Sequence, residues 1–136
     1  MAFLDDMIDI LELDGVGTAN TDIFASSAAT IPLLASGLAT LHLIQTAGLE
    51  PERTHNAVLT PAYVQPGMQV TAAANTYAAA FAKATLAYNS LFKIRNQFIN
   101  SGWYKWVKPL QEPGDSGVNP SGQSRVSFNV IANKRP

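Results

Sequence analysis

The residues of this chain best suited to catalysis are its two histidines, His42 and His55. Neither lies in an H-E-x-x-H zinc-protease pattern or near a G-x-S-x-G nucleophile turn. His42 falls in an apolar segment, where a hydrogen-bonded core histidine is a simpler interpretation than a catalytic base, and His55 falls in a polar segment typical of an exposed loop. The sequence therefore predicts a protein that is not an enzyme.

Acidic and glycine residues form only weak matches to known metal and phosphate sites. The segment 14–22, DGVGTANTD, lacks the spacing of an EF-hand calcium loop and its glutamate at the twelfth position. Gly15 and Gly17 lack the third glycine and the preceding strand of a dinucleotide-binding turn. The chain contains no cysteine, which excludes disulfides, thiolate zinc sites and iron–sulfur clusters. We therefore expect no catalytic, cofactor-binding or metal-binding residues.

The densest group of aromatic and basic side chains is the segment 103–108, WYKWVK. Interleaved rings and amines can stack on bases and neutralise phosphates, can anchor a subunit interface, or can close a hydrophobic core at the end of a helix. The other basic residues are spread thinly over residues 53–136, which makes a diffuse cationic surface. We therefore rank an interface or core role first and nucleic-acid binding second.

Charge is divided along the chain. Residues 1–52 contain eight acidic side chains and no Lys or Arg, whereas residues 53–136 contain nine basic and two acidic side chains. The two parts carry formal charges of −8 and +7, and the whole chain carries −1. Opposite charges can pair within one molecule or steer the acidic part of one copy onto the basic part of another. We expect a single domain, residues 1–136, with an acidic half and a basic half.

Charged residues are scarce as well as separated. They make up 14% of the chain, and residues 23–49 and 54–82 contain none. Such spans must be buried or covered by small neutral polar groups. Burial between subunits would account for them.

Two helices are expected in the acidic half. Residues 3–13, FLDDMIDILEL, have an apolar stripe opposite their acids and form a short amphipathic helix. Residues from about 31 to 47 form a second helix that is apolar on nearly every side, with Thr30 as its N-cap and Gly48 as its terminator. A helix of that kind lies in a core, in an assembly or in a membrane.

A third, long helix is expected over residues from about 67 to 101. Tyr77, Ala84, Leu91 and Phe98 recur at heptad spacing, and Phe81 and Tyr88 lie between them. Such a helix is about 50 Å long, whereas a compact domain of this size is only about 37 Å across. We therefore expect it to break at residues 75–76 or 89–90, or to protrude and be covered by another molecule.

The C-terminal part is expected to form strands. Residues 103–107 and 125–132 have strand composition and are joined by a long Gly/Pro/Ser loop, and residues 133–136 form an extended arm. Together with the helices, these strands predict a predominantly helical α+β fold.

These patterns favour a non-enzymatic structural subunit of a virus or phage particle (capsid, tail or coat) or of a filament. Its expected partners are copies of itself, with other structural proteins as further candidates. One alternative is a membrane-associated protein with residues 31–49 inserted, although the apolar stretch there is shorter than the about 20 residues that a span needs. The other is a small nucleic-acid-binding module. The acidic start lacks the basic region of a signal peptide, so we expect an unprocessed protein made in the cytoplasm. The candidate interface residues are Asp5, Asp6, Asp9, Glu12, Tyr77, Phe81, Tyr88, Leu91, Arg95, Phe98, Trp103, Tyr104, Lys105, Trp106 and Lys108.

Overall fold

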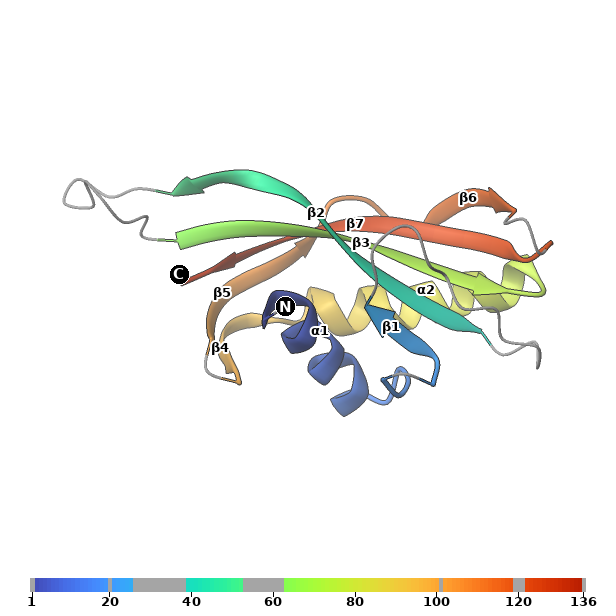
Figure 1. Ribbon diagram of the computed structural model, residues 1–136, viewed down its shortest axis with the longest axis horizontal. Coiled ribbons are helices and arrows are strands. Elements are labelled where there is room, and N and C mark those ends of the chain that lie inside the picture. The colour runs from blue at the N-terminus through green and yellow to red at the C-terminus, as the bar shows by residue number, and fades with distance from the viewer. Residues whose placement is uncertain are drawn as a thin grey trace.

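A curled seven-stranded sheet wraps around one helix, and a second helix lies beside that helix on the same side of the sheet (Figure 1). The computed structural model describes residues 2–19, 21–25, 39–52, 63–100, 102–118 and 122–135. The elements are α1 (Ala2–Leu13), β1 (Ile23–Ala25), β2 (Thr40–Glu52), β3 (Tyr63–Ala74), α2 (Tyr77–Phe92), β4 (Arg95–Ile99), β5 (Gly102–Pro109), β6 (Gly114–Val118) and β7 (Ser124–Lys134). The strand order is β1-β2-β3-β7-β5-β4, and β6 also pairs with β7. Only β1 and β2 are parallel among these pairs.

The inner face of the sheet is built by alternation along the central parts of β3 and β7. Successive side chains of a strand point to opposite faces, so Val70 and its cross-strand partner Phe128 share the inner face, and both are buried. Thr71 and Ser127 face outward and are half-buried. Small neutral polar groups therefore cover part of the outer face, and burial within one chain accounts for much of the described charge-free spans, although Leu49, Tyr77 and Phe81 remain exposed.

Helix α2 packs on the sheet through a stripe of small residues. Ala80, Ala84, Ala87 and Leu91 are all fully buried. Their spacing of three or four residues places them on one face, and alanines let a helix approach a curved sheet closely. The helix begins where the Thr76 side chain accepts a hydrogen bond from the backbone N–H of Ala79 at 3.2 Å, which is an N-cap.

The amphipathic helix expected over residues 3–13 is confirmed as α1. Phe3, Leu4, Met7 and Leu11 are buried, and α1 contacts α2, β1 and β2. This helix closes the side of the core that the sheet leaves open beside α2.

The prediction of a predominantly helical fold is wrong, and the long helix over 67–101 is the main reason. Those residues form part of β3, then α2, then β4. Val70 and Ala74 are four residues apart, which suits a helix face, but they also have the even spacing of a strand face, and the sheet uses that second pattern. Helix α2 starts next to residues 75–76, one of the two expected breaks. The expectation that another molecule must cover a protruding helix therefore loses its basis.

The apolar helix expected over 31–47 is also wrong for the part that the structure describes. Residues 26–38 lie outside the described residues, and Thr40–Glu52 form β2. Leu41 and Leu43 face inward and His42 faces outward, yet all three are buried. The apolar character of this segment on every side is therefore that of a strand covered on both faces.

Gly48 does not terminate a helix. It lies in β2, where a Cβ atom would sit 1.9 Å from the carbonyl oxygen of Gln65. Glycine is needed there because the backbones of β2 and β3 approach closely. No helix among the described residues is both long and apolar enough to cross a membrane. His55 and the connector around it lie outside the described residues.

The two C-terminal strands are confirmed, but the terminal arm is not. Strands β5 and β7 include the expected segments and pair in antiparallel fashion. Asn133 and Lys134 continue β7, Asn133 is fully buried, and the N–H of Arg135 donates to the Trp103 carbonyl at 3.0 Å. Asn133 and Lys134 therefore belong to β7, which lies inside the sheet between β3 and β5, and Arg135 is bonded to β5.

We expect the Leu91→Ala substitution to lower the free energy of unfolding by about 2–5 kcal/mol, because it opens a cavity between α2 and the sheet. The matched control is Leu86→Ala in the same helix, where the side chain is 53% exposed and we expect a change within about 0.5 kcal/mol. Urea unfolding of both variants measures the difference. Equal losses would contradict this packing of α2.

Candidate interaction surface

The acidic residues of α1 are tied to the second half of the chain by neutral donors. Asp6 is buried and accepts hydrogen bonds from the Tyr104 hydroxyl and from Asn100 Nδ2, both at 2.7 Å. Asn100 Nδ2 also lies 2.8 Å from Asp9 Oδ2. Burial, reinforced by the Asp6 carboxylate, raises the pKa of Tyr104 far above its usual range, so its hydroxyl stays a donor. The turn between β4 and β5 is thereby fixed to α1.

Two further carboxylates fix the loop after α1 to α2. Ser90 Oγ donates to Asp14 at 2.5 Å. Lys83 Nζ lies 2.9 Å from Asp22 Oδ2 and donates to the Val16 carbonyl at 2.5 Å. Burial by itself raises the pKa of Asp22, but the Thr18 N–H and the Lys83 ammonium together outweigh it, so this pKa lies below its usual value. Between described residues, Lys83–Asp22 is the one ion pair.

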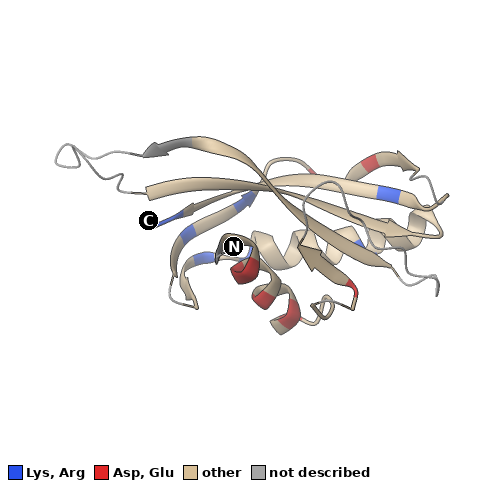
Figure 2. Cartoon of the chain, in the orientation of Figure 1, with Lys and Arg blue, Asp and Glu red and all other residues tan. Residues whose placement is uncertain are grey.

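Among the described residues, the two charged halves therefore meet through one ion pair, Lys83–Asp22, and otherwise through neutral donors. Figure 2 shows acidic positions grouped along α1 and basic positions on β4, β5 and the C-terminal end of β7. Hydrogen bonds from Tyr104, Asn100 and Ser90 satisfy acids that the sequence suggested would need cations. Within the described residues, Arg95 and Lys108 form no ion pair with an acid.

The WYKWVK segment does not form one continuous binding surface. Trp103 packs edge-on against Phe98 with ring centroids 5.0 Å apart, and Tyr104 is buried beneath the sheet. Lys105 Nζ lies 5.3 Å from the centroid of the Tyr63 ring. A register shift between Tyr104 and Trp106 interrupts the alternation of inward and outward side chains along β5. Neighbouring residues of the segment therefore contact different parts of the fold.

Helix α2 carries an aromatic stripe on one flank. Tyr77, Phe81, Tyr88 and Phe92 are spaced by four, seven and four residues, so they share one face. Their rings form two pairs, with centroids 5.9 Å apart in Tyr77–Phe81 and 6.1 Å apart in Tyr88–Phe92. Tyr88 also packs edge-on against Phe128 of β7. The other three rings are exposed.

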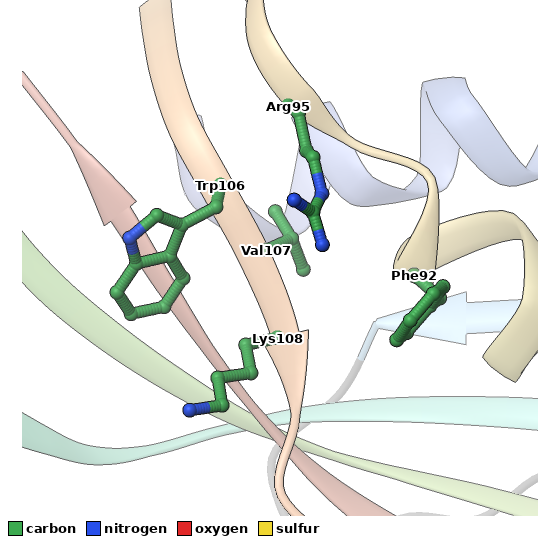
Figure 3. A pocket seen from close by; sticks show the side chains of 5 residues that line it. All are labelled: Phe92, Arg95, Trp106, Val107 and Lys108. Carbon is green, nitrogen blue, oxygen red and sulfur yellow. The ribbon is translucent and has the colours of Figure 1, made fainter.

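The stripe ends at a hollow of about 360 Å³ over β5. It is lined by Phe92, Arg95, Trp106, Val107 and Lys108. Figure 3 shows Arg95 and Phe92 along one side of β5, and Trp106 and Lys108 along the other. Arg95 and Trp106 are register partners across the β4–β5 pair, although their side chains extend to opposite sides of β5 (Figure 3). We call the stripe and the hollow together the aromatic–cationic surface.

The structure sorts the expected interface residues into four groups. Asp6, Leu91 and Tyr104 are buried in the chain's own core, so they are removed from any surface that could meet a neighbour. The acids Asp5, Asp9 and Glu12 lie exposed on α1. The aromatic–cationic surface brings together Tyr77, Phe81, Tyr88, Arg95, Trp106 and Lys108, whereas Phe98, Trp103 and Lys105 lie elsewhere on β4 and β5.

Sequence reasoning missed Phe92 and Leu13. Phe92 follows Tyr88 by four residues, which is the signal that could have extended the aromatic spacing to the end of α2. Leu13 ends α1 with its side chain 80% exposed, although it belongs by type to the apolar stripe of that helix. Both residues are the last of their helices, where the repeat of apolar residues stops.

His42 lies inside the fold and not at an open site. It is buried, its ring stacks on Phe24 with centroids 5.4 Å apart, and its Nε2 atom has no hydrogen-bond partner among the described residues. Burial lowers its pKa, so the ring is neutral near pH 7. In the part of the chain that the structure describes, no three His, Asp or Glu side chains gather as metal ligands.

We expect Asp22→Asn to lower the free energy of unfolding at pH 7 by about 1–3 kcal/mol, because Lys83 loses a charged acceptor. The folded pKa of Asp22 lies below its ordinary value of 3.8, so this contribution is present above pH 3.8 and is lost as the pH falls through the folded pKa. Urea unfolding at pH 7, 5 and 3 should show the gap between wild type and variant closing at the lowest pH. Glu112→Gln, at an exposed loop residue, is the control, and a gap independent of pH would contradict the assignment.

Comparison with known proteins adds no family to this geometry. No protein-family model matches the chain, and no curated protein shows significant sequence similarity to it. The surface itself therefore carries the functional argument.

Proposed function

We propose that this protein is a non-enzymatic structural subunit that assembles with copies of itself. The observation that carries the proposal is the aromatic–cationic surface, where exposed rings adjoin Arg95 and Lys108. Aromatic residues and Arg are the side chains enriched at the centres of protein interfaces. Monomeric proteins rarely leave such a patch uncovered.

The separation of charge supports the same proposal. Three exposed acids, Asp5, Asp9 and Glu12, lie together on α1, and Arg95, Lys105 and Lys108, which lack an ion pair among the described residues, lie on β4 and β5. A contact between the acidic face of one copy and the basic surface of the next is heterologous, and contacts of that type produce rings or filaments. The proposal no longer draws on a protruding helix or a terminal arm, since neither is present in the described residues.

A virus or phage particle is the setting that we propose for this assembly, as a capsid, tail or coat component. The attribution rests on a small chain without cysteine that is rich in Ala, Thr and Asn. Other structural proteins of the particle are further candidate partners. The proposal of an inserted helix over 31–49 is withdrawn, because Thr40–Glu52 form a strand.

Nucleic acid is the second candidate partner, and the hollow is the observation that favours it. Trp106 and Phe92 can stack on bases while Arg95 and Lys108 neutralise phosphates. Against this, Trp103 and Lys105 of the same segment are engaged elsewhere, which leaves a short platform.

We expect the protein to be larger than a monomer at low ionic strength and to lose mass as salt is added. At about 0.01 M salt, charges interact over about 30 Å, whereas at 1 M they interact over about 3 Å. Sedimentation velocity at high micromolar concentration in both buffers measures the change. A stable monomer in the low-salt buffer would remove the basis of the proposal.

The nucleic-acid alternative makes a different prediction. If phosphate contacts drive binding, a gel shift with single-stranded oligonucleotides should appear at low salt and vanish at high salt. We expect no shift at protein concentrations that already support self-association. A shift that disappears in Arg95→Glu would favour nucleic acid over a second copy.

A further inference from the structure

Two surfaces of this chain match each other in chemistry. One is the hollow over β5, which combines aromatic rings with two cations. The other is the exposed face of α1, where Asp5, Asp9 and Glu12 lead to Leu13 at the end of the helix. We infer that the C-terminal end of α1 from one copy, Glu12 and Leu13, docks in the hollow of the next copy. This inference rests on the proposed self-assembly and names the contact that produces it.

The lining of the hollow defines what it can hold. Phe92 is 52% exposed, Trp106 is half-buried and Val107 is buried, so an apolar side chain would gain contacts on three residues. Arg95 and Lys108 are exposed cations without an acid among the described residues. A purely charged ligand would leave the rings in water, and a purely apolar one would leave the cations without a partner. The fitting occupant therefore presents an aliphatic side chain next to carboxylates.

The end of α1 presents that combination. Leu13 is the most exposed of the large apolar side chains in the described residues, at 80%. Glu12 precedes it, Asp9 lies one turn earlier on the same face, and the last turn of α1 contains no basic residue. The negative charge at this end comes from the side-chain carboxylates, because the carbonyls of Ile10, Leu11 and Glu12 already accept N–H groups of the residues that follow. Arg95 and Lys108 are suited to meet this charge on either side of the leucine.

The two surfaces belong to different elements, so the contact is head-to-tail. α1 supplies the end of one copy, whereas α2, β4 and β5 of the next copy supply the hollow. Each molecule then has one surface of each kind, and addition of copies continues until a ring closes or a filament forms. Loss of either surface alone should stop growth.

A mixing experiment tests this contact. Leu13→Arg places a cation at the helix end, and Arg95→Glu combined with Lys108→Glu reverses the charge of the hollow. We expect the apparent Kd for self-association of each variant to rise about ten-fold or more, because like charges would meet at the contact. A mixture of the two variants should form a 1:1 dimer through its one intact end and one intact hollow, and growth should stop there because the altered end still carries Asp9 and Glu12, which repel the two glutamates of the altered hollow. Sedimentation velocity at low salt measures these masses, and circular dichroism checks the fold.

Matched controls separate the contact from general charge effects. Lys93→Glu changes the charge close to the hollow without lining it, and Val118→Arg adds a cation at an exposed apolar position of β6. Both should assemble like wild type. If wild type assembles and the hollow variant assembles equally well, this docking is wrong while self-assembly stands. If wild type is monomeric, the proposed function itself fails.

A second measurement does not depend on charge reversal. The chain has no cysteine, so introduced cysteines can be cross-linked selectively. Under mild oxidation, a mixture of Leu13→Cys and Lys108→Cys proteins should give a disulfide-linked dimer, and a mixture of Val118→Cys and Lys108→Cys should not. Equal cross-linking in both mixtures would overturn the docking. So would a wild-type assembly that Arg95→Glu with Lys108→Glu leaves intact while abolishing an oligonucleotide gel shift.

Discussion

The fold depends on closing the open flank of a curled sheet. The sheet buries one side of α2, but its curvature does not cover the flank that carries Lys83 and Ser90. Helix α1 and the loop after it fill that place, with Met7 and Leu11 fully buried. Hydrogen bonds from Ser90, Asn100 and the Lys83 ammonium to carboxylates fix the segment in position. Without this closure the core between α2 and the sheet would be open to water.

This way of closing the core explains why most acidic and basic side chains of the described residues are not paired with each other after folding. Carboxylates that accept hydrogen bonds from amide and hydroxyl groups do not need cations from the basic half. Asp6 is satisfied by Tyr104 and Asn100, and only Asp22 uses a lysine among the described residues. Arg95 and Lys108 are consequently left at the surface beside aromatic rings. The same bonds that complete the core thus leave Arg95 and Lys108 without an ion pair among the described residues.

Helix α2 has two faces with different consequences. Its alanines allow close packing on the sheet, and its aromatic residues are too large for that place and remain on the flank. Tyr88 shows the boundary, because it packs against Phe128 and also against the exposed Phe92. A heptad pattern read from sequence mixes these two faces, since Ala84 and Leu91 point inward while Tyr77 and Phe81 point outward. The sequence of α2 therefore has the heptad spacing of a coiled coil, whereas in the fold this helix packs against the sheet.

Local patterns in the sequence determined several features by themselves. The helix at 3–13 follows from its amphipathic period, and the strands around 103–107 and 125–132 follow from their composition, because short-range periodicity decides both. Tertiary structure decided the rest. Residues 68–74 fit either a helix or a strand, and pairing with β2 and β7 selected the strand. The hollow also needed the fold, because Phe92, Arg95 and Trp106 are brought together by the sheet register, which no spacing along the chain encodes.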